Sequence, residues 1–242
     1  MIYTIATAKG GTGKTTTAAS LVQAAAHTGR SALAIDLDPQ GSLSYALAAD
    51  ARATGSYDLL HGAPAADVTQ KSPQGMDVIT GSLNLQTETS GKGSARRLSE
   101  ALEPVRSKYD LIVIDAPATA GELQYNALMA ADRLVIVLEA DSHGVQALYQ
   151  ITTAAEQIRQ SNTRLQPAGV LIARYRGNAN IRKYMREQIE ATAKSLGIPY
   201  LGEARDAAAT AEATAFQQSL FDYAPRSTTA ADYMRVFETI IK

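Results

Sequence analysis

The chain has 242 residues, of which 45% are hydrophobic and 19% charged, so it can bury a sizeable core and long disordered tracts are not expected. Its net charge of −1 excludes a bulk polycation, so any nucleic-acid binding must come from a local patch. The absence of cysteine excludes disulfides, thiolate metal sites and cysteine nucleophiles.

Short apolar, β-branched runs alternate with helical segments along the chain. Six runs predict buried strands: Ile2–Thr7, Ser31–Ile35, Met76–Thr80, Leu111–Ile114, Leu134–Leu138 and Val170–Ala173. Helices are predicted over Thr15–His27, Ala95–Lys108, Gly144–Gln160, Asn180–Ser195 and Thr229–Ile241, with short helical pieces up to Gly75 and a mobile loop over Ser82–Ser94.

Strands that are apolar throughout and alternate with helices predict an α/β fold with a mostly parallel, twisted sheet and helices on both faces. Ligands then bind beyond the carboxyl ends of the strands. No linker, repeat or second hydrophobic domain is visible, so residues 1–242 are predicted to form a single domain.

A glycine-rich stretch joins the first predicted strand to the first predicted helix, and it consists of Lys9, Gly10, Gly11, Thr12, Gly13, Lys14, Thr15 and Thr16. Glycines let backbone N–H groups turn inward around an anion, and the helix N-terminus adds partial positive charge. In this context Lys14 is expected to reach the β- and γ-phosphates of a nucleotide, and the Thr15 hydroxyl to bind Mg²⁺. The alternative is a turn that merely starts a helix, which an ordered motif between strand and helix makes improbable.

Ala8 holds the first glycine position of the general phosphate-loop pattern, and Lys9 follows it. This second lysine resembles the deviant Walker A motif of the ParA/MinD family of ATPases. The resemblance implies a three-layer P-loop NTPase fold that binds Mg-ATP, with Lys9 reaching into the neighbouring subunit to contact its phosphates. Such a lysine would couple hydrolysis to dimerisation. Taken alone, Lys9 fits an exposed loop lysine better.

Asp36 and Asp38 follow the second predicted strand. Two carboxylates two residues apart on a strand point to the same face, where they can hold metal-bound water or orient an attacking water. The alternative is a polar strand end at which Asp38 starts a turn before Pro39. The D-x-D-P-Q-G string resembles the family's second motif, which implies that Asp38 positions the hydrolytic water and Asp36 supports the metal shell.

The run Leu111–Ile114 ends at Asp115, which is the Walker B pattern of an apolar strand with a terminal carboxylate beside the phosphate loop. Asp115 is therefore expected to contact Mg²⁺, usually through water. Family members often carry Pro-Pro-Ser after this carboxylate, whereas this chain has Pro117, Ala118 and Thr119.

The resemblance continues to the end of the chain. Asn126-Ala127-Leu128 with Ala131-Asp132 is similar to a family helix, and Tyr223 to Ser227 is similar to its C-terminal Y-x-P-x-S pattern. Arg205 matches the arginine that flanks adenine in the family. Because the phosphate loop begins at Lys9, the chain resembles the short, Soj-like ParA proteins that lack an N-terminal helix-turn-helix domain.

A cluster of basic residues without an acid among them follows the sixth predicted strand: Arg174, Arg176, Arg182, Lys183 and Arg186. Arg182 and Arg186 share a helix face. In the short ParA proteins this region, together with the arginine matched by Arg205, binds DNA without sequence preference, which is a phosphate-directed and salt-sensitive interaction. The alternative is an ordinary solvated helix face, since Glu187 and Glu190 soon balance the charge.

The resemblance implies a DNA-partitioning ATPase that forms an ATP-dependent sandwich homodimer, hydrolyses Mg-ATP slowly and is stimulated by a ParB-like or other adaptor. A cytoplasmic, nucleoid-associated protein is expected, since no signal peptide and no run of about 18 apolar residues occurs. Two alternatives stay open: a MinD-like membrane-positioning ATPase and a metabolic P-loop ligase or kinase. The last helix is expected to dock on the core through Tyr233, Phe237, Ile240 and Ile241 rather than to anchor in a membrane.

Overall fold

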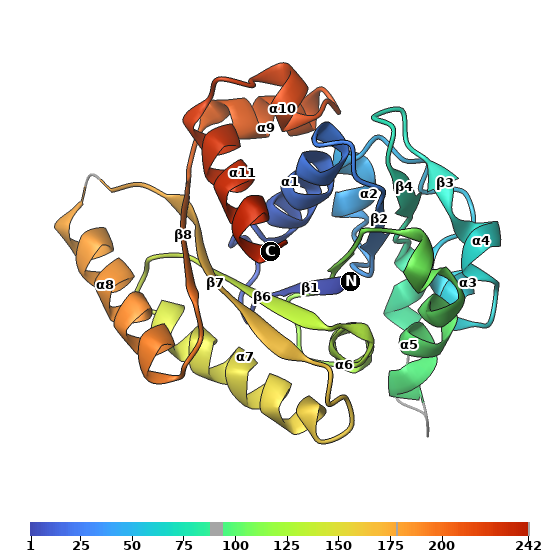
Figure 1. Cartoon of the computed structure of the whole chain (residues 1–242), viewed down its shortest axis with the longest axis horizontal. Helices are drawn as coiled ribbons and strands as arrows, with labels where there is room; N and C mark the ends of the chain where they lie inside the picture. Colours follow the sequence, from blue (N-terminus) through green and yellow to red (C-terminus); the bar gives the residue numbers. More distant parts are fainter. Residues whose placement is uncertain (88–93, 178, 242) are drawn as a thin grey trace.

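The computed structural model describes residues 1–87, 94–177 and 179–241. Within these ranges, eight strands form one sheet in the order β3-β4-β2-β5-β1-β6-β7-β8 (Figure 1). The strands span Ile2–Ala6 (β1), Ala32–Asp36 (β2), Gln70–Lys71 (β3), Asp77–Ile79 (β4), Leu111–Asp115 (β5), Arg133–Leu138 (β6), Gln166–Tyr175 (β7) and Tyr200–Arg205 (β8). Neighbouring strands are parallel except β3 and β4. The predicted α/β fold is confirmed, and this continuous sheet supports the single domain, which stays a prediction.

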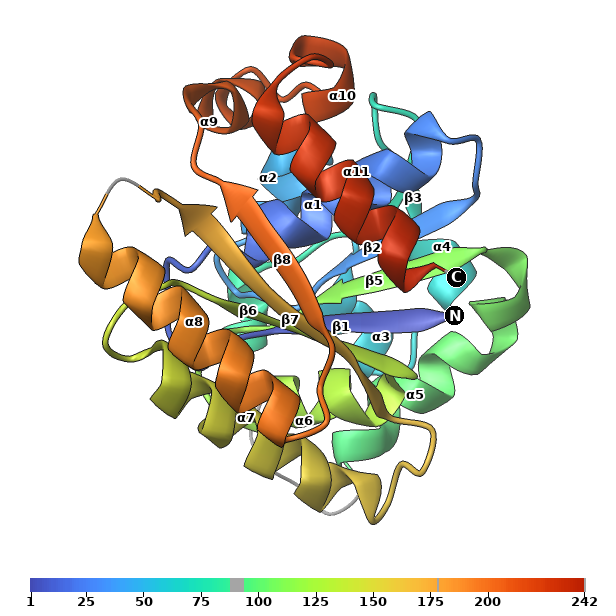
Figure 2. The same cartoon turned by 60° about the vertical axis from the view of Figure 1, so that its left-hand side comes forward.

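Helices lie on both faces of the sheet (Figures 1 and 2). They span Lys14–His27 (α1), Ser42–Ala46 (α2), Ser56–Leu60 (α3), Ala65–Val68 (α4), Arg97–Leu102 (α5), Glu122–Ala130 (α6), Gly144–Arg159 (α7), Asn180–Ser195 (α8), Ala208–Ala215 (α9), Leu220–Tyr223 (α10) and Thr228–Ile240 (α11). Tyr3 and Ile5 of β1 pack with α1, α2 and α9 to α11, whereas Ile2 packs with α3 to α6 on the opposite face. Because both faces are buried, the central strands are apolar at every position.

Two differences from the prediction concern one predicted helix and one strand that was not predicted. The single helix predicted over Ala95–Lys108 is a 3₁₀ turn at Ser94–Arg96, the helix α5, and a second 3₁₀ segment at Glu103–Lys108. Pro104 explains the break, because it lacks an N–H and its ring clashes with the preceding helical turn.

The second difference is β8, which was missed because its sequence, YLGEAR, is neither continuously apolar nor alternating. In the predicted mobile loop, Leu83–Thr87 form a 3₁₀ helix anchored by the buried Leu85, and residues 88–93 lie outside the described residues.

The last helix docks on the core as predicted. Tyr233 and Phe237 of α11 are buried, and the helix packs against α1 and β8. None of the helices in the described ranges has the length and hydropathy of a membrane span.

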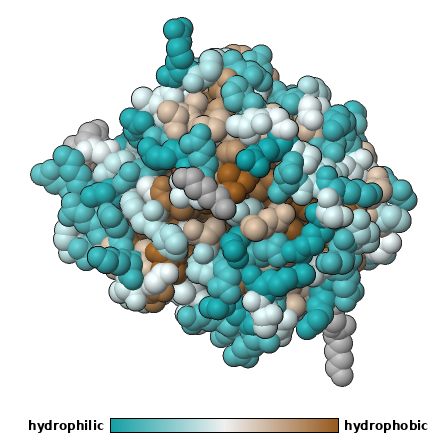
Figure 3. Space-filling model, viewed as in Figure 1, coloured by the Kyte–Doolittle hydropathy of each residue, from teal (hydrophilic) through white to brown (hydrophobic). Residues whose placement is uncertain are grey.

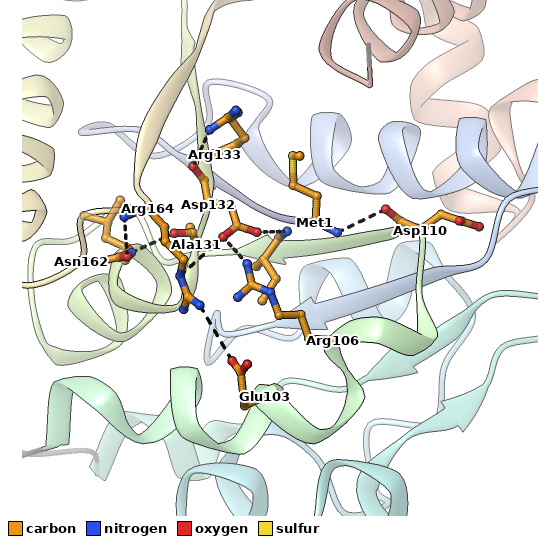
Figure 4. Close-up of polar contacts among 11 residues, drawn as sticks. Met1, Glu103, Arg106, Asp110, Ala131, Asp132, Arg133, Asn162 and Arg164 are labelled. Carbon is orange, nitrogen blue, oxygen red and sulfur yellow. Dashed lines mark hydrogen bonds and ion pairs between the residues drawn. The ribbon is translucent and has the colours of Figure 1, made fainter.

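A buried polar cluster holds the amino ends of the strands together (Figure 4). Asp132, which precedes β6, is 7% exposed and accepts a 2.8 Å hydrogen bond from the Ile2 N–H at the start of β1. Its other carboxylate oxygen accepts from the Arg106 guanidinium and lies 3.8 Å from Nε of Arg164. Nearby, the Asn162 amide donates to the Leu128 carbonyl in the last turn of α6 and to the Ala131 carbonyl just after it. Asp132 therefore ties β1, β6 and the segment before β5 into one edge.

We expect Asp132→Ala to lower the free energy of unfolding by about 2–4 kcal/mol, because it leaves the Arg106 guanidinium and the Ile2 N–H without an acceptor. Chemical denaturation would measure the change. Glu103→Ala is a matched control in the same cluster: this carboxylate is 63% exposed and 4.0 Å from Arg164. Its removal should change stability by less than about 0.5 kcal/mol. Equal losses in the two variants would contradict the structural role of Asp132.

Candidate functional site

A cavity of about 930 Å³ opens at the carboxyl edge of the sheet. The predicted phosphate loop, residues 9–16, forms its floor, and Asp38, Arg174 and Arg205 contribute to its walls. The far wall comes from α2 and α9, where Tyr45 faces Thr214 and Ala215. The structure therefore brings together, around one cavity, residues predicted from four separate stretches of sequence.

The phosphate loop has a backbone that only glycine adopts readily. Gly11 and Gly13 have φ angles of +81° and +89°. A Cβ atom at Gly13 would also lie 3.1 Å from the Cβ of Ala173, so β7 leaves no room for a side chain there. Immediately after Gly13 the chain enters α1, whose first residue is Lys14. The loop thus wraps the N-terminus of this helix, as an anion site requires.

Lys14, Thr15 and Asp115 form a tight group under the loop. Nζ of Lys14 lies 2.5 Å from Oδ1 of Asp115, and the Thr15 hydroxyl donates to Oδ2 at 2.7 Å. Asp115 is fully buried and Lys14 is only 6% exposed. Burial raises the pKa of Asp115, and the Lys14 ammonium opposes part of that shift. The residue predicted to bind phosphate therefore neutralises the residue predicted to bind metal.

Asp36 and Asp38 do not share a face, which corrects that expectation. β2 ends at Asp36, whose carboxylate is buried and accepts hydrogen bonds from the N–H of Asp38 at 3.0 Å and from the N–H and hydroxyl of Ser44, both at 2.8 Å. Burial, and then the charge of Asp115, raises the pKa of Asp36 to about 7. Asp38 instead faces the cavity. Asp36 thus shapes the turn that presents Asp38, and its metal role stays a prediction.

Lys9 lies against its own subunit. Its Nζ donates to Oδ2 of Asp141 at 2.7 Å and is 3.9 Å from Glu139, while the side chain is 45% exposed. The hydrogen bond and charge of Asp141 raise the pKa of Lys9. Burial opposes ionisation of Asp141, but hydrogen bonds from Lys9 and the His143 N–H lower its pKa overall. Glu139 and Asp141 were missed, although two acids directly after an apolar strand beside β1 are a usable signal.

The five predicted DNA-binding residues do not form one free basic surface. Arg176 donates to Asp206 at 2.6 Å, and Arg186 lies 3.3 to 3.5 Å from Glu187, Glu190 and Glu203. Arg174 instead lines the cavity above the phosphate loop.

Of these five residues, only Arg182 and Lys183, on the first turn of α8, have no ion pair with any part of the chain that the structure describes. The exposed Ile181 and Tyr184 flank them.

Arg205 is held at the rim of the cavity by a carboxylate that the sequence did not single out. Its Nε and Nη2 donate to the two oxygens of Asp232 at 2.7 and 2.8 Å. Asp232 is 2% exposed on α11, so this two-pronged contact fixes the guanidinium plane. An adenine contact by Arg205 stays a prediction.

We expect Gly13→Ala to lower the free energy of unfolding by about 1–3 kcal/mol, because it adds both a left-handed backbone penalty and a contact with Ala173. Gly10→Ala is the matched control, since Gly10 has no positive φ and no atom within 4 Å of its missing Cβ. That change should stay within about 0.5 kcal/mol. Thermal denaturation would compare the stabilities of the two variants. Equal stability would argue against the close approach of β7 to the loop.

Comparison with known proteins gives consistent results. Residues 1–167 match the family described as an AAA domain. The chromosome-partitioning ATPase Soj of Thermus thermophilus is 31% identical, over 98% of this chain and 94% of its own length. The chromosome partitioning protein ParA of Caulobacter vibrioides is 35% identical, over 78% of this chain and 75% of its own length. An ATP complex of a substituted McdA from Cyanothece matches with a TM-score of 0.85 at 22% identity, covering 99% and 94% of the two chains. This last likeness concerns the fold alone.

Proposed function

The chain belongs to the ParA/MinD family of ATPases, and from this premise we propose that it is an ATP-dependent switch that partitions DNA or positions another cargo. One observation carries the proposal: Lys14, Thr15 and Asp115 lie in contact beneath a glycine loop that faces a cavity of about 930 Å³. Both relatives are named for chromosome partitioning, which supports DNA as the kind of cargo.

The residues around the loop fit a magnesium nucleotide. The buried Thr12 hydroxyl lacks a hydrogen-bond partner, which is costly unless a ligand supplies one. Within the described ranges, no three His, Asp or Glu side chains cluster as a closed metal cage. Mg²⁺ suits such a site, because it usually keeps several waters and takes few protein ligands beside phosphate oxygens. Bound Mg²⁺ would neutralise charge on the phosphates.

We assign the following roles to the chain's own residues. Thr15 and Asp115 hold the metal, and Lys14 exchanges Asp115 for the β- and γ-phosphates. Asp38 orients the attacking water. Asp36 supports Asp38 by accepting a hydrogen bond from its N–H, which fixes the turn between the two residues. Backbone N–H groups of residues 10–16 surround the phosphates, and Arg205 lies beside the base.

The proposed active form is a sandwich homodimer with two nucleotides at the interface. To reach the opposite nucleotide, Lys9 must leave Asp141 and Glu139, a contact that is half-exposed and therefore weak. Hydrolysis is slow until a ParB-like or other adaptor stimulates it. A MinD-like membrane role is disfavoured, because the apolar face of α11 is already buried against the core.

We expect Asp38→Ala to accumulate as an ATP-bound dimer, because nucleotide still binds while the attacking water loses its carboxylate. Size-exclusion chromatography with Mg-ATP would measure the dimer fraction.

Two further variants serve as comparisons. Lys14→Ala should bind no nucleotide and stay monomeric, and Lys9→Ala should bind ATP without dimerising. Persistent monomers of Asp38→Ala with saturating ATP would refute the sandwich dimer. Rapid turnover of a small-molecule substrate would instead favour the ligase or kinase alternative.

DNA binding is proposed to centre on Arg182 and Lys183, and two copies in a dimer would double this small patch. We expect the double variant Arg182→Ala, Lys183→Ala to lose retention of duplex DNA by the ATP-bound protein and to show a smaller salt dependence. Arg186→Ala is the control, because three glutamates already surround that guanidinium. Unchanged retention in the double variant, measured at low salt, would remove this surface from the proposal.

A further inference from the structure

Arg174 lies in a strained segment of β7. Its φ angle is +53°, in the left-handed region that non-glycine residues rarely occupy. The pairing of β7 with β8 also shifts here: Ile172 pairs with Glu203 and Tyr175 with Arg205, so three steps on β7 match two on β8. This is a β-bulge, a feature that re-aims a side chain and occurs often beside active sites. Strain of this kind persists only where surrounding contacts stabilise it.

The Arg174 side chain lines the cavity and runs beside the phosphate loop. Its Cγ would lie 3.4 Å from a Cβ atom at Gly13, so the stem runs close to that residue. At the far end, Nη1 donates to the Gly11 carbonyl at 2.8 Å and lies 3.5 Å from Oε1 of Glu139. Arg174 therefore contacts the loop at two of its glycines, and Glu139 holds the guanidinium from the other side.

The contact with Gly11 constrains the next N–H group. The Gly11 carbonyl and the Thr12 N–H belong to one planar peptide, and every peptide bond in the described chain is trans, so the two groups point in opposite directions. Holding the Gly11 carbonyl against Arg174 therefore fixes the Thr12 N–H so that it points away from the guanidinium. That N–H has no partner within the described residues. An unpaired backbone N–H whose orientation is fixed is what a phosphate-binding loop offers to an anion.

We propose that Arg174 is a positioning residue for phosphate binding: by anchoring the Gly11 carbonyl, it pre-orients the Gly11–Thr12 peptide for the nucleotide. This inference rests on the proposed nucleotide site. It also removes Arg174 from the predicted DNA-binding surface and assigns Glu139 to the orientation of its guanidinium.

The test compares binding of Mg-ATP, Mg-ADP and pyrophosphate by calorimetry. Arg174→Ala should weaken all three by a similar, roughly tenfold factor, the loss expected for one charge-assisted hydrogen bond. Arg174→Gly should lose the same affinity while its melting temperature stays equal or rises, because glycine relieves the left-handed strain. Arg174→Lys should recover part of the affinity, since an ammonium can still donate to Gly11. DNA retention at saturating ATP should be unchanged in all three variants.

If the wild-type protein binds these ligands, three results would overturn the inference alone. Equal nucleotide affinity in the wild type and Arg174→Gly would show that the contact does not prepare the loop. Parallel losses of stability and affinity in Arg174→Gly would reduce Arg174 to a structural residue. Normal nucleotide binding with lost DNA retention would return it to the DNA surface. A wild-type protein that binds none of the three ligands would overturn the proposed function itself, and the inference with it.

Discussion

The contact between Lys14 and Asp115 is the interaction on which the carboxyl edge of the sheet depends. A buried lysine is stable only beside an opposite charge, so the start of α1 must stay against the end of β5. Asp115 is in register with Ile5 of β1 and with Asp36 of β2, which brings the ends of three strands level. From that common level, the phosphate loop, the turn that carries Asp38 and the segment after β5 all emerge toward one cavity.

The same principle of charge compensation extends outward from this buried pair. Lys9 is matched by Asp141, and Arg174 by Glu139, so each cation around the loop has a carboxylate partner. In the proposed function, a bound triphosphate competes with these carboxylates for Lys14 and Lys9. Ligand binding is therefore linked to rearrangement of side chains on β5 and after β6, as expected when a ligand favours one of two arrangements. Arg174 differs, because its contact with a backbone carbonyl shapes the loop before a ligand arrives.

The basic segment from Arg174 to Arg186 illustrates how tertiary contacts change the interpretation of a charge cluster. In sequence its five cations form one patch, but β8 and the turn after it bring Glu203 and Asp206 against Arg186 and Arg176. The edge strand β8 was itself invisible to pattern analysis, because its residues are half-exposed and mixed in polarity. Without that strand, the sequence could predict neither the neutralised arginines nor the two hydrogen bonds between Arg205 and Asp232.

By itself, the sequence determined the α/β class, the phosphate loop and the terminal carboxylate Asp115. These features depend on local sterics: apolar runs specify buried strands, and an ordered set of glycines specifies a loop of inward N–H groups. Only the tertiary structure shows that Asp36 and Asp38 point to different places and that Asp132 joins the amino ends of the strands. It also shows that Arg174 contacts the phosphate loop. The roles of Asp132 and Arg174 depend on strand order, register and one bulge, which join residues more than a hundred positions apart and so leave no local pattern.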